Sequence, residues 1–258
     1  MPGGAEGTRR HSRRGLLGIA ALAAAALALP RVWQRLRPDA PRIPHDTVAG
    51  FYRLPDSAVS GVMDPFAGLG APDPDAIVPA TLPGGGPAIC SLLFRDGRAP
   101  GTVPVAYFTD ANCALCREMD PWVNTLPADR VSLTVHDLPL LGPTSVIAAR
   151  AVAAAARQGA GPQMRARLNR VRLQPDPAYI AQLAKGIGLA PQRLVADMSS
   201  ADVTDRIAQS LGLGVAFRII GTPALVIGDT LAVGRRSEAD LRGMVDAAAR
   251  RLEDMVCT

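Results

Sequence analysis

Several features that mark common protein classes are scarce or absent in this sequence. Its 258 residues are 48% hydrophobic, which excludes a fully disordered chain, and no internal repeat points to a repeat array. The longest apolar run, residues 15–29, is 15 residues long, and a helix needs about 20 to span a hydrocarbon core. The length allows one or two domains.

An excess of basic charge is also missing from most of the chain. The whole sequence has a net charge of +5, but residues 1–37 contain seven arginines and one acid. Residues 38–258 have 21 basic and 22 acidic groups, a net charge of −1. Binding along the phosphates of nucleic acid needs clustered positive charge, so the composition excludes nucleic acid as a partner.

The basic N-terminal segment has the layout of an export signal. Four arginines precede the apolar run, which contains small alanines and ends at Pro30. Residues 12–17, SRRGLL, are also similar to the twin-arginine signal. An ordinary secretory signal and an uncleaved membrane anchor are the alternatives. In each case residues 1–37 predict a folded part outside the cytoplasm, where cysteines can oxidise.

Residues 38–87 are predicted to be a linker. They contain ten of the 23 prolines and a run of three glycines, and no apolar period persists over them. Two pieces, 48–54 and 62–69, are apolar enough to pack on the surface of a neighbouring domain. The domain itself is expected over residues 88–257.

Residues 88–257 have the pattern of an α/β domain. Five apolar runs with β-branched or aromatic residues are predicted strands: 88–94, 103–109, 131–135, 219–220 and 224–227. The period is helical from about 142 to 217, and a capping box at Ser237 begins a last helix. This order predicts a mixed sheet with an all-helical insertion at about 142–217.

Cys113 and Cys116 have the C-x-x-C spacing of zinc sites, redox pairs, haem attachment sites and structural disulfides. Position 117 is not the histidine that haem attachment needs, and the other cysteines and histidines are scattered singly, unlike zinc ligands. The pair stands between a predicted strand and a predicted helix. The first turn of a helix stabilises a thiolate through its unpaired N–H groups and dipole. This position favours a redox pair, in which Cys113 reacts with a client thiol and Cys116 resolves the mixed disulfide.

Three motifs resemble those of DsbA-like thiol-disulfide oxidoreductases. Residues 105–116, VAYFTDANCALC, are similar to the active-site strand and helix of that family. Residues 138–145, LPLLGPTS, are similar to the segment that opens its helical insertion, and residues 221–223, GTP, resemble its cis-proline loop. The motifs occur in the order of the family, and the resemblance covers roughly residues 88–254. It implies a thioredoxin-like fold with a helical insertion.

The resemblance also implies a function. It implies an exported, periplasmic enzyme that exchanges disulfides with reduced or unfolded client proteins and is reset by a membrane redox partner. Neither a metal nor another cofactor is expected. Thr222 and Pro223 are expected to bind the client, because a cis X-Pro bond turns the preceding backbone toward the helix N-terminus. There it can pair with an extended substrate near Cys113.

The sequence departs from the family pattern in three places. One is Thr222, since a threonine in place of valine before the proline also occurs in reductase and isomerase relatives and leaves the direction of transfer open. Neither a histidine nor a proline stands between the two cysteines, so a very strong oxidant is not expected. Tyr107 occupies the position where some thioredoxin-fold proteins have a buried acid, so proton transfer needs Asp110, Glu118 or water. A disulfide isomerase or reductase, a glutathione-dependent isomerase or transferase, and a copper-handling chaperone that binds metal through the C-x-x-C pair remain alternatives.

Cys90 and Cys257 complete an even number of cysteines. Cys90 lies on the first predicted strand and Cys257 at the end of the last predicted helix. These elements are neighbours where a terminal helix covers a sheet, so an oxidising compartment favours a structural disulfide between them. A buried thiol at Cys90 and an exposed thiol at Cys257 are the alternative.

Overall fold

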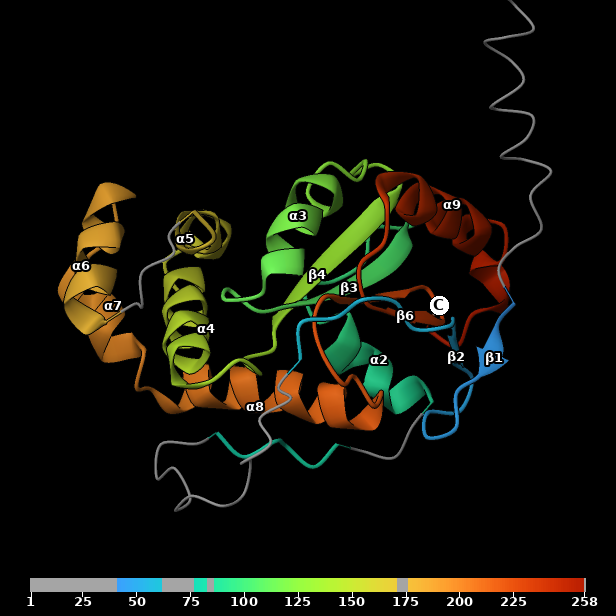
Figure 1. Ribbon diagram of the computed structural model, residues 1–258, viewed down its shortest axis with the longest axis horizontal. Helices are drawn as coiled ribbons and strands as arrows, with labels where there is room; N and C mark the ends of the chain where they lie inside the picture. The colour runs from blue at the N-terminus through green and yellow to red at the C-terminus, as the bar shows by residue number, and fades with distance from the viewer. Residues whose placement is uncertain (1–40, 62–76, 83–85, 171–175, 258) are drawn as a thin grey trace, which may run out of the picture. The chain divides into compact units, whose positions relative to one another are not determined.

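The computed structural model describes residues 41–61, 77–82, 86–170 and 176–257 (Figure 1). In these residues, six strands form one mixed sheet in the order β1-β2-β6-β5-β3-β4. The strands are β1 (Ile43–Pro44), β2 (Tyr52–Arg53), β3 (Val103–Thr109), β4 (Val131–Asp137), β5 (Ala224–Ile227) and β6 (Thr230–Val233). The helices are α2 (Pro87–Leu93), α3 (Ala114–Val123), α4 (Pro143–Ala156), α5 (Gly161–Leu168), α6 (Pro177–Gly186), α7 (Pro191–Asp197), α8 (Ala201–Ala216) and α9 (Glu238–Ala249), followed by the short 3-10 helix η1 (Leu252–Asp254).

Strand β3 runs through the middle of the sheet, parallel to β4 and antiparallel to β5. Its alternate residues enter two separate apolar clusters. Val105 and Tyr107 pack with residues of α3 and α9, whereas Ala106 and Phe108 pack with residues of α2 and α8. Figure 1 shows these two pairs of helices on opposite sides of the sheet. Because both faces are covered, all seven residues of β3 are buried, which explains the continuous apolar run in the sequence.

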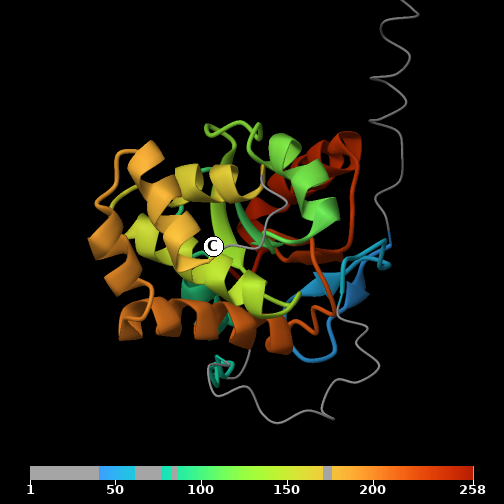
Figure 2. The same ribbon diagram turned by 60° about the vertical axis from the view of Figure 1, so that its left-hand side comes forward.

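Helices α4 to α8 lie between β4 and β5 in the chain and form the predicted all-helical insertion (Figure 2). They share an apolar core of their own, centred on the buried alanines of α4. Larger side chains from each of the other helices complete it: Met164, Leu168, Ile180, Leu194, Val203 and Ile207. The mixed α/β sheet with an all-helical insertion is therefore as predicted.

Two of the predicted strands are wrong. Residues 88–94 belong mostly to helix α2, which has a proline in its first turn, where a backbone N–H has no partner within the helix. Ile89 and Leu93, four residues apart, both face the core, as on one side of a helix. Residues 219–220 lie in the loop after α8, and Ile220 is 66% exposed. A short apolar run without clear alternation does not distinguish a strand from a buried helical turn.

Part of the stretch predicted as a linker is integrated into the domain. Strand β2 pairs in parallel with β6 and antiparallel with β1, so residues 41–61 extend one edge of the sheet. Val48, Phe51 and Leu54 are buried, in line with the expected packing of residues 48–54. The other apolar piece, 62–69, and the predicted signal or anchor, 1–37, lie outside the described residues. None of the helices that the structure describes is long and apolar enough to span a membrane.

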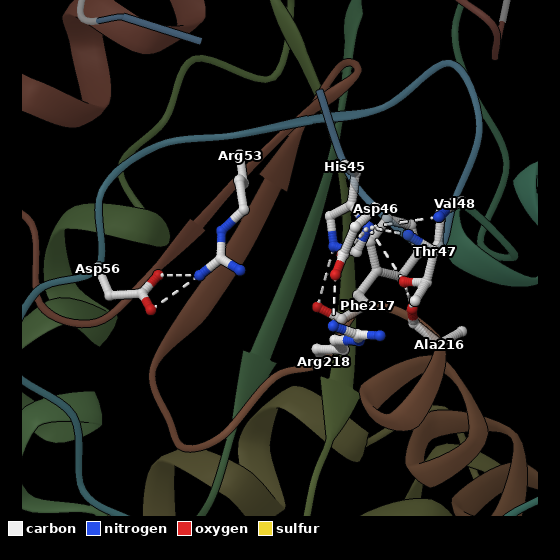
Figure 3. A network of polar contacts seen from close by, with 9 residues as sticks. All are labelled: His45, Asp46, Thr47, Val48, Arg53, Asp56, Ala216, Phe217 and Arg218. Atoms are coloured by element: carbon white, nitrogen blue, oxygen red, sulfur yellow. Dashed lines mark hydrogen bonds and ion pairs between the residues drawn. The ribbon is translucent and has the colours of Figure 1, made fainter. Parts of the chain in front are cut away.

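Polar contacts fasten the start of this segment to the end of α8 (Figure 3). Nε2 of His45 lies 3.2 Å from the carbonyl oxygen of Phe217, and Oγ1 of Thr47 donates to the carbonyl oxygen of Ala216 at 2.6 Å. Carbonyl groups at the C-terminal end of a helix have no partner within it, so these contacts satisfy two of them. Burial lowers the pKa of His45.

A second histidine, His136 on β4, is completely buried. Its ring stacks on Phe108, and its Nε2 lies 2.8 Å from the carbonyl oxygen of Leu93. Burial, together with the positive charge of Arg95, lowers the pKa of His136 to about 3. The folded state therefore holds this residue neutral at pH values where an unfolded chain protonates it.

His136 is expected to make folding stability depend on pH. An unfolded histidine titrates near pH 6.5, so between about pH 3 and 6.5 the unfolded state binds the extra proton. Stability from this residue is full above that range and falls by up to about 1.4 kcal/mol per unit as the pH drops through it. In urea titrations between pH 4 and 6, His136→Phe should reduce the slope of unfolding free energy against pH by roughly that amount.

Other groups with shifted pKa values do not affect the difference in slope between the wild type and His136→Phe. His45, with its lowered pKa, and Asp110 and Asp120, whose pKa values burial raises, are present in both proteins. Their contributions cancel in the difference between the two slopes. Identical slopes for the wild type and His136→Phe would contradict the prediction.

Candidate active site

Cys113 and Cys116 stand where β3 ends and α3 begins, and a disulfide joins them with their Cα atoms 5.2 Å apart. Cys113 is the N-cap of α3, and its Sγ accepts a hydrogen bond from the backbone N–H of Cys116 at 2.9 Å. The backbone N–H of Cys113 donates to the carbonyl oxygen of Asp110 at 3.0 Å. Negative charge is stabilised at a helix N-terminus, so this geometry favours a thiolate on Cys113 when the pair is reduced.

The loop before β5 meets this helix N-terminus. In the sheet Phe108 of β3 lies opposite Ala224 of β5, and the two strands are antiparallel. The residues that follow β3 and those that precede β5 therefore lie at the same end of these two strands. The Thr222–Pro223 peptide bond is cis, and the carbonyl oxygen of Thr222 lies 3.5 Å from Sγ of Cys113. The structure thus brings the predicted residues Cys113, Thr222 and Pro223 together.

These residues are closed off from solvent. Cys113 and Thr222 are 0% exposed, and Cys116 is 1% exposed. The hydroxyl group of Thr222 is buried without a hydrogen-bond partner in the described part of the chain. Across the described ranges, no group of three or more histidine, cysteine or acidic side chains is arranged to hold a metal ion.

Asp110, one of the predicted proton acceptors, has all its acceptor capacity in use. Its buried carboxylate accepts four hydrogen bonds, two at each oxygen. The donors are the N–H of Asn112 at 2.8 Å, the N–H of Leu140 at 2.9 Å, the N–H of Leu141 at 3.1 Å and the hydroxyl of Ser145 at 2.7 Å. Asp110 thereby links the loop before Cys113 to the start of the helical insertion, and we assign it a positioning role.

Glu118, another predicted acceptor, points to the surface, where its half-exposed side chain pairs with Arg235 at 2.7 Å. The buried acid of this helix is Asp120, which sequence reasoning missed. The hydroxyl of Tyr107 donates to Oδ1 of Asp120 at 2.7 Å, and the Asn169 amide donates to the other carboxylate oxygen. Burial raises the pKa of Asp120. Asp120 is four residues after Cys116, so both lie on one face of the helix. This spacing was the signal in the sequence that could have identified Asp120.

Cys90 and Cys257 are also joined by a disulfide, with their Cα atoms 5.5 Å apart. Cys90 comes from helix α2, and not from a strand as predicted. Both cysteines pack with the apolar cluster on the face of the sheet that α2 and α8 cover. The bond therefore ties the end of the chain to α2, in the core of the domain.

Comparisons with known proteins agree with this geometry. A family model for the DSBA-like thioredoxin domain matches residues 104–246, which include the C-x-x-C pair, the insertion and the cis-proline loop. Among curated proteins, none matches the chain with significant similarity.

Solved structures show similar folds. A thioredoxin-like oxidoreductase from Silicibacter pomeroyi DSS-3 is 30% identical with a TM-score of 0.56, over 62% of this chain and 97% of that one. A periplasmic thioredoxin-like protein from Salmonella enterica serovar Typhimurium is 26% identical with a TM-score of 0.53, over 63% and 96%. The thiol-disulfide exchange protein alpha-DsbA2 from Wolbachia pipientis is 22% identical with a TM-score of 0.57, over 62% and 91%. The predicted thioredoxin-like fold with a helical insertion is confirmed, and the chain belongs to the family of DSBA-like thioredoxin domains, a family of thiol-disulfide oxidoreductases.

Proposed function

We propose that the protein is an exported enzyme that exchanges disulfides with reduced or unfolded client proteins through Cys113 and Cys116. The observation that carries the proposal is the position of the Cys113 sulfur, at a helix N-terminus and 3.5 Å from the carbonyl oxygen of Thr222. A sulfur in this position is a good leaving group, and the backbone of Thr222 beside it can pair with an extended client when its bonds within the chain open. The export signal predicted in residues 1–37 and the periplasmic relative from Salmonella support the location.

The reaction follows from the two sulfurs. A client thiolate attacks Sγ of Cys113, the Cys113–Cys116 bond breaks, and Cys116 leaves as a thiolate that takes up a proton. A second client thiolate then attacks the client sulfur of the mixed disulfide and releases Cys113. Two client thiols thereby lose two electrons and two protons, and the protein disulfide becomes two thiols. Attack by Cys116 on the mixed disulfide reverses the first step.

The N–H of Cys116 contributes to this chemistry, because its 2.9 Å hydrogen bond to Sγ of Cys113 can also stabilise the released thiolate. The proposal includes Thr222 and Pro223 as client-binding residues, and a membrane redox partner that oxidises the pair again. A disulfide reductase would use the same residues in the opposite net direction, and a disulfide isomerase would use them to rearrange client disulfides with no net oxidation or reduction. The reduction potential of the pair, measured in glutathione buffers, separates these directions.

The test uses the full chain with its Cys113–Cys116 disulfide intact and a synthetic unstructured peptide that contains two cysteines. We expect one peptide disulfide to form for each protein disulfide lost, when peptide oxidation is followed by chromatography and protein thiols are counted by alkylation and mass spectrometry. Oxidised glutathione alone, at the same disulfide concentration, is the control for uncatalysed exchange. A peptide that stays reduced beside an oxidised protein contradicts the proposal.

A further inference from the structure

The N-terminal segment continues beyond β2 as an extended strap, residues 54–61, along the edge of β6 (Figure 1). Its backbone forms two hydrogen bonds with β6, from Leu54 N–H to Leu231 O at 2.9 Å and from Ser57 N–H to Val233 O at 2.9 Å. A third bond runs from the N–H of Arg235, two residues after β6, to the carbonyl oxygen of Ala58 at 2.7 Å. The side chain of Arg236 adds a fourth bond, to the carbonyl oxygen of Pro55 at 2.6 Å. The strap is therefore held like an additional edge strand.

The strap then reaches the loop of the active site. The N–H of Ser60 donates to the carbonyl oxygen of Thr222 at 2.8 Å, and the N–H of Thr222 donates to the carbonyl oxygen of Ser60 at 3.0 Å. The two residues form an antiparallel β-bridge. The approach is close, since a Cβ added to Gly221 would lie 2.8 Å from the carbonyl oxygen of Ser60. A glycine at position 221 permits this contact.

The backbone N–H and the carbonyl oxygen of Thr222 are therefore both hydrogen-bonded to Ser60 of the same chain. The same Thr222 carbonyl oxygen lies 3.5 Å from Sγ of Cys113, and both residues are fully buried. An extended polypeptide that brings a cysteine to Cys113 needs a backbone edge beside it, and antiparallel pairing with Thr222 supplies one. Two strands cannot pair with the same edge at the same time.

We infer that the strap residues 57–61 occupy the backbone-pairing site of polypeptide clients at Thr222, and that a client pairs there only after it displaces Ser60. This rests on the proposed function. The strap thereby acts on specificity, since it disfavours clients that pair weakly with Thr222. A small dithiol has no backbone and forms no strand, so the strap affects polypeptide substrates more than small ones.

Ser60→Pro in the full chain tests this. Proline has no N–H, so the bond from Ser60 to Thr222 is lost, and the preceding residue already lies in an extended segment that accepts a following proline. The matched control is Ala58→Pro, because among the described residues the exposed Ala58 donates no backbone hydrogen bond. Both variants and the wild type are assayed for exchange with the two-cysteine peptide and with dithiothreitol.

The quantity compared is the ratio of the peptide rate to the dithiothreitol rate. We expect Ser60→Pro to raise this ratio about fivefold, the effect of one backbone hydrogen bond lost from the competing strap, and Ala58→Pro to leave it unchanged. An unchanged or lower ratio for Ser60→Pro, with dithiothreitol still oxidised, overturns the inference and leaves the proposed function standing. A wild type that oxidises neither substrate overturns both.

Amide hydrogen exchange gives a second measurement that does not depend on the folding of Ser60→Pro. The Cys116→Ser variant is examined alone and as the mixed disulfide that forms when its Cys113 thiolate attacks and breaks the disulfide of the oxidised peptide. In the complex we expect the Ser60 amide to exchange at least about tenfold faster, because the strap is displaced, while the Thr222 amide stays protected by the client. Unchanged protection of the Ser60 amide in the complex overturns the inference.

Discussion

Replacing Cys113 with serine should reduce disulfide exchange with peptides and small dithiols to the uncatalysed rate. The sulfur of Cys113 is the one that lies beside Thr222, and a serine hydroxyl neither forms a disulfide nor leaves as a stable anion at neutral pH. Cys116→Ser should instead keep the reacting sulfur and lose its partner. When the Cys113 thiolate of this variant attacks the disulfide of the oxidised peptide, no second protein sulfur completes the exchange, so mixed disulfides should accumulate and run as a heavier band on non-reducing gels.

The control for these variants is the double replacement Cys90→Ala with Cys257→Ala, which removes two cysteines that pack on the opposite face of the sheet from α3. It should retain exchange per folded molecule. Full activity of Cys113→Ser would contradict the assignment of the reacting sulfur. Mixed disulfides in Cys113→Ser but none in Cys116→Ser would reverse the two roles.

Removing the bond between Cys90 and Cys257 is expected to lower the free energy of unfolding by about 5 kcal/mol. The bond joins residues separated by 167 positions, and in the chain-entropy model closing so long a loop removes much of the freedom of the unfolded chain. Both cysteines pack in the apolar cluster beneath α2 and α8, so alanine is the suitable replacement. The measurement is urea unfolding of the double variant and the wild type at pH 7.

The dithiothreitol rate of the double variant, measured at a urea concentration where it stays folded, checks that the active site is intact. The m-value should increase, because an unfolded chain without the bond exposes more surface. A loss of less than about 1 kcal/mol would contradict the prediction and indicate compensating strain in the native bond.

Local interactions explain what could be read from the sequence. Cys113 caps its own helix, the capping box at Ser237 is present, and β3 is a buried run bounded by polar residues, as predicted. Each of these three features depends on residues that are close together in the sequence. The helical insertion was predictable for the same reason, since its apolar period extends over several helices.

Other features depend on contacts between distant segments. Residues 88–94 contain too few residues to show a helical period, and the core that α2 covers decides their structure. Buried Asp120 accepts hydrogen bonds from Tyr107 and Asn169, and neither of these residues is near it in sequence. The bridge between Ser60 and Thr222 joins a segment that composition marks as a linker to the edge of the active site.

By itself, the sequence determined the C-x-x-C pair, the helix that carries it, the α/β class and the family, because these follow from short motifs and local periodicity. Only the tertiary structure decided which acid is buried beneath the pair, how close Cys113 lies to Thr222, and which segment pairs with the backbone of Thr222. Backbone pairing at a sheet edge uses N–H and C=O groups that every residue has, so residue types carry little information about which segment pairs there.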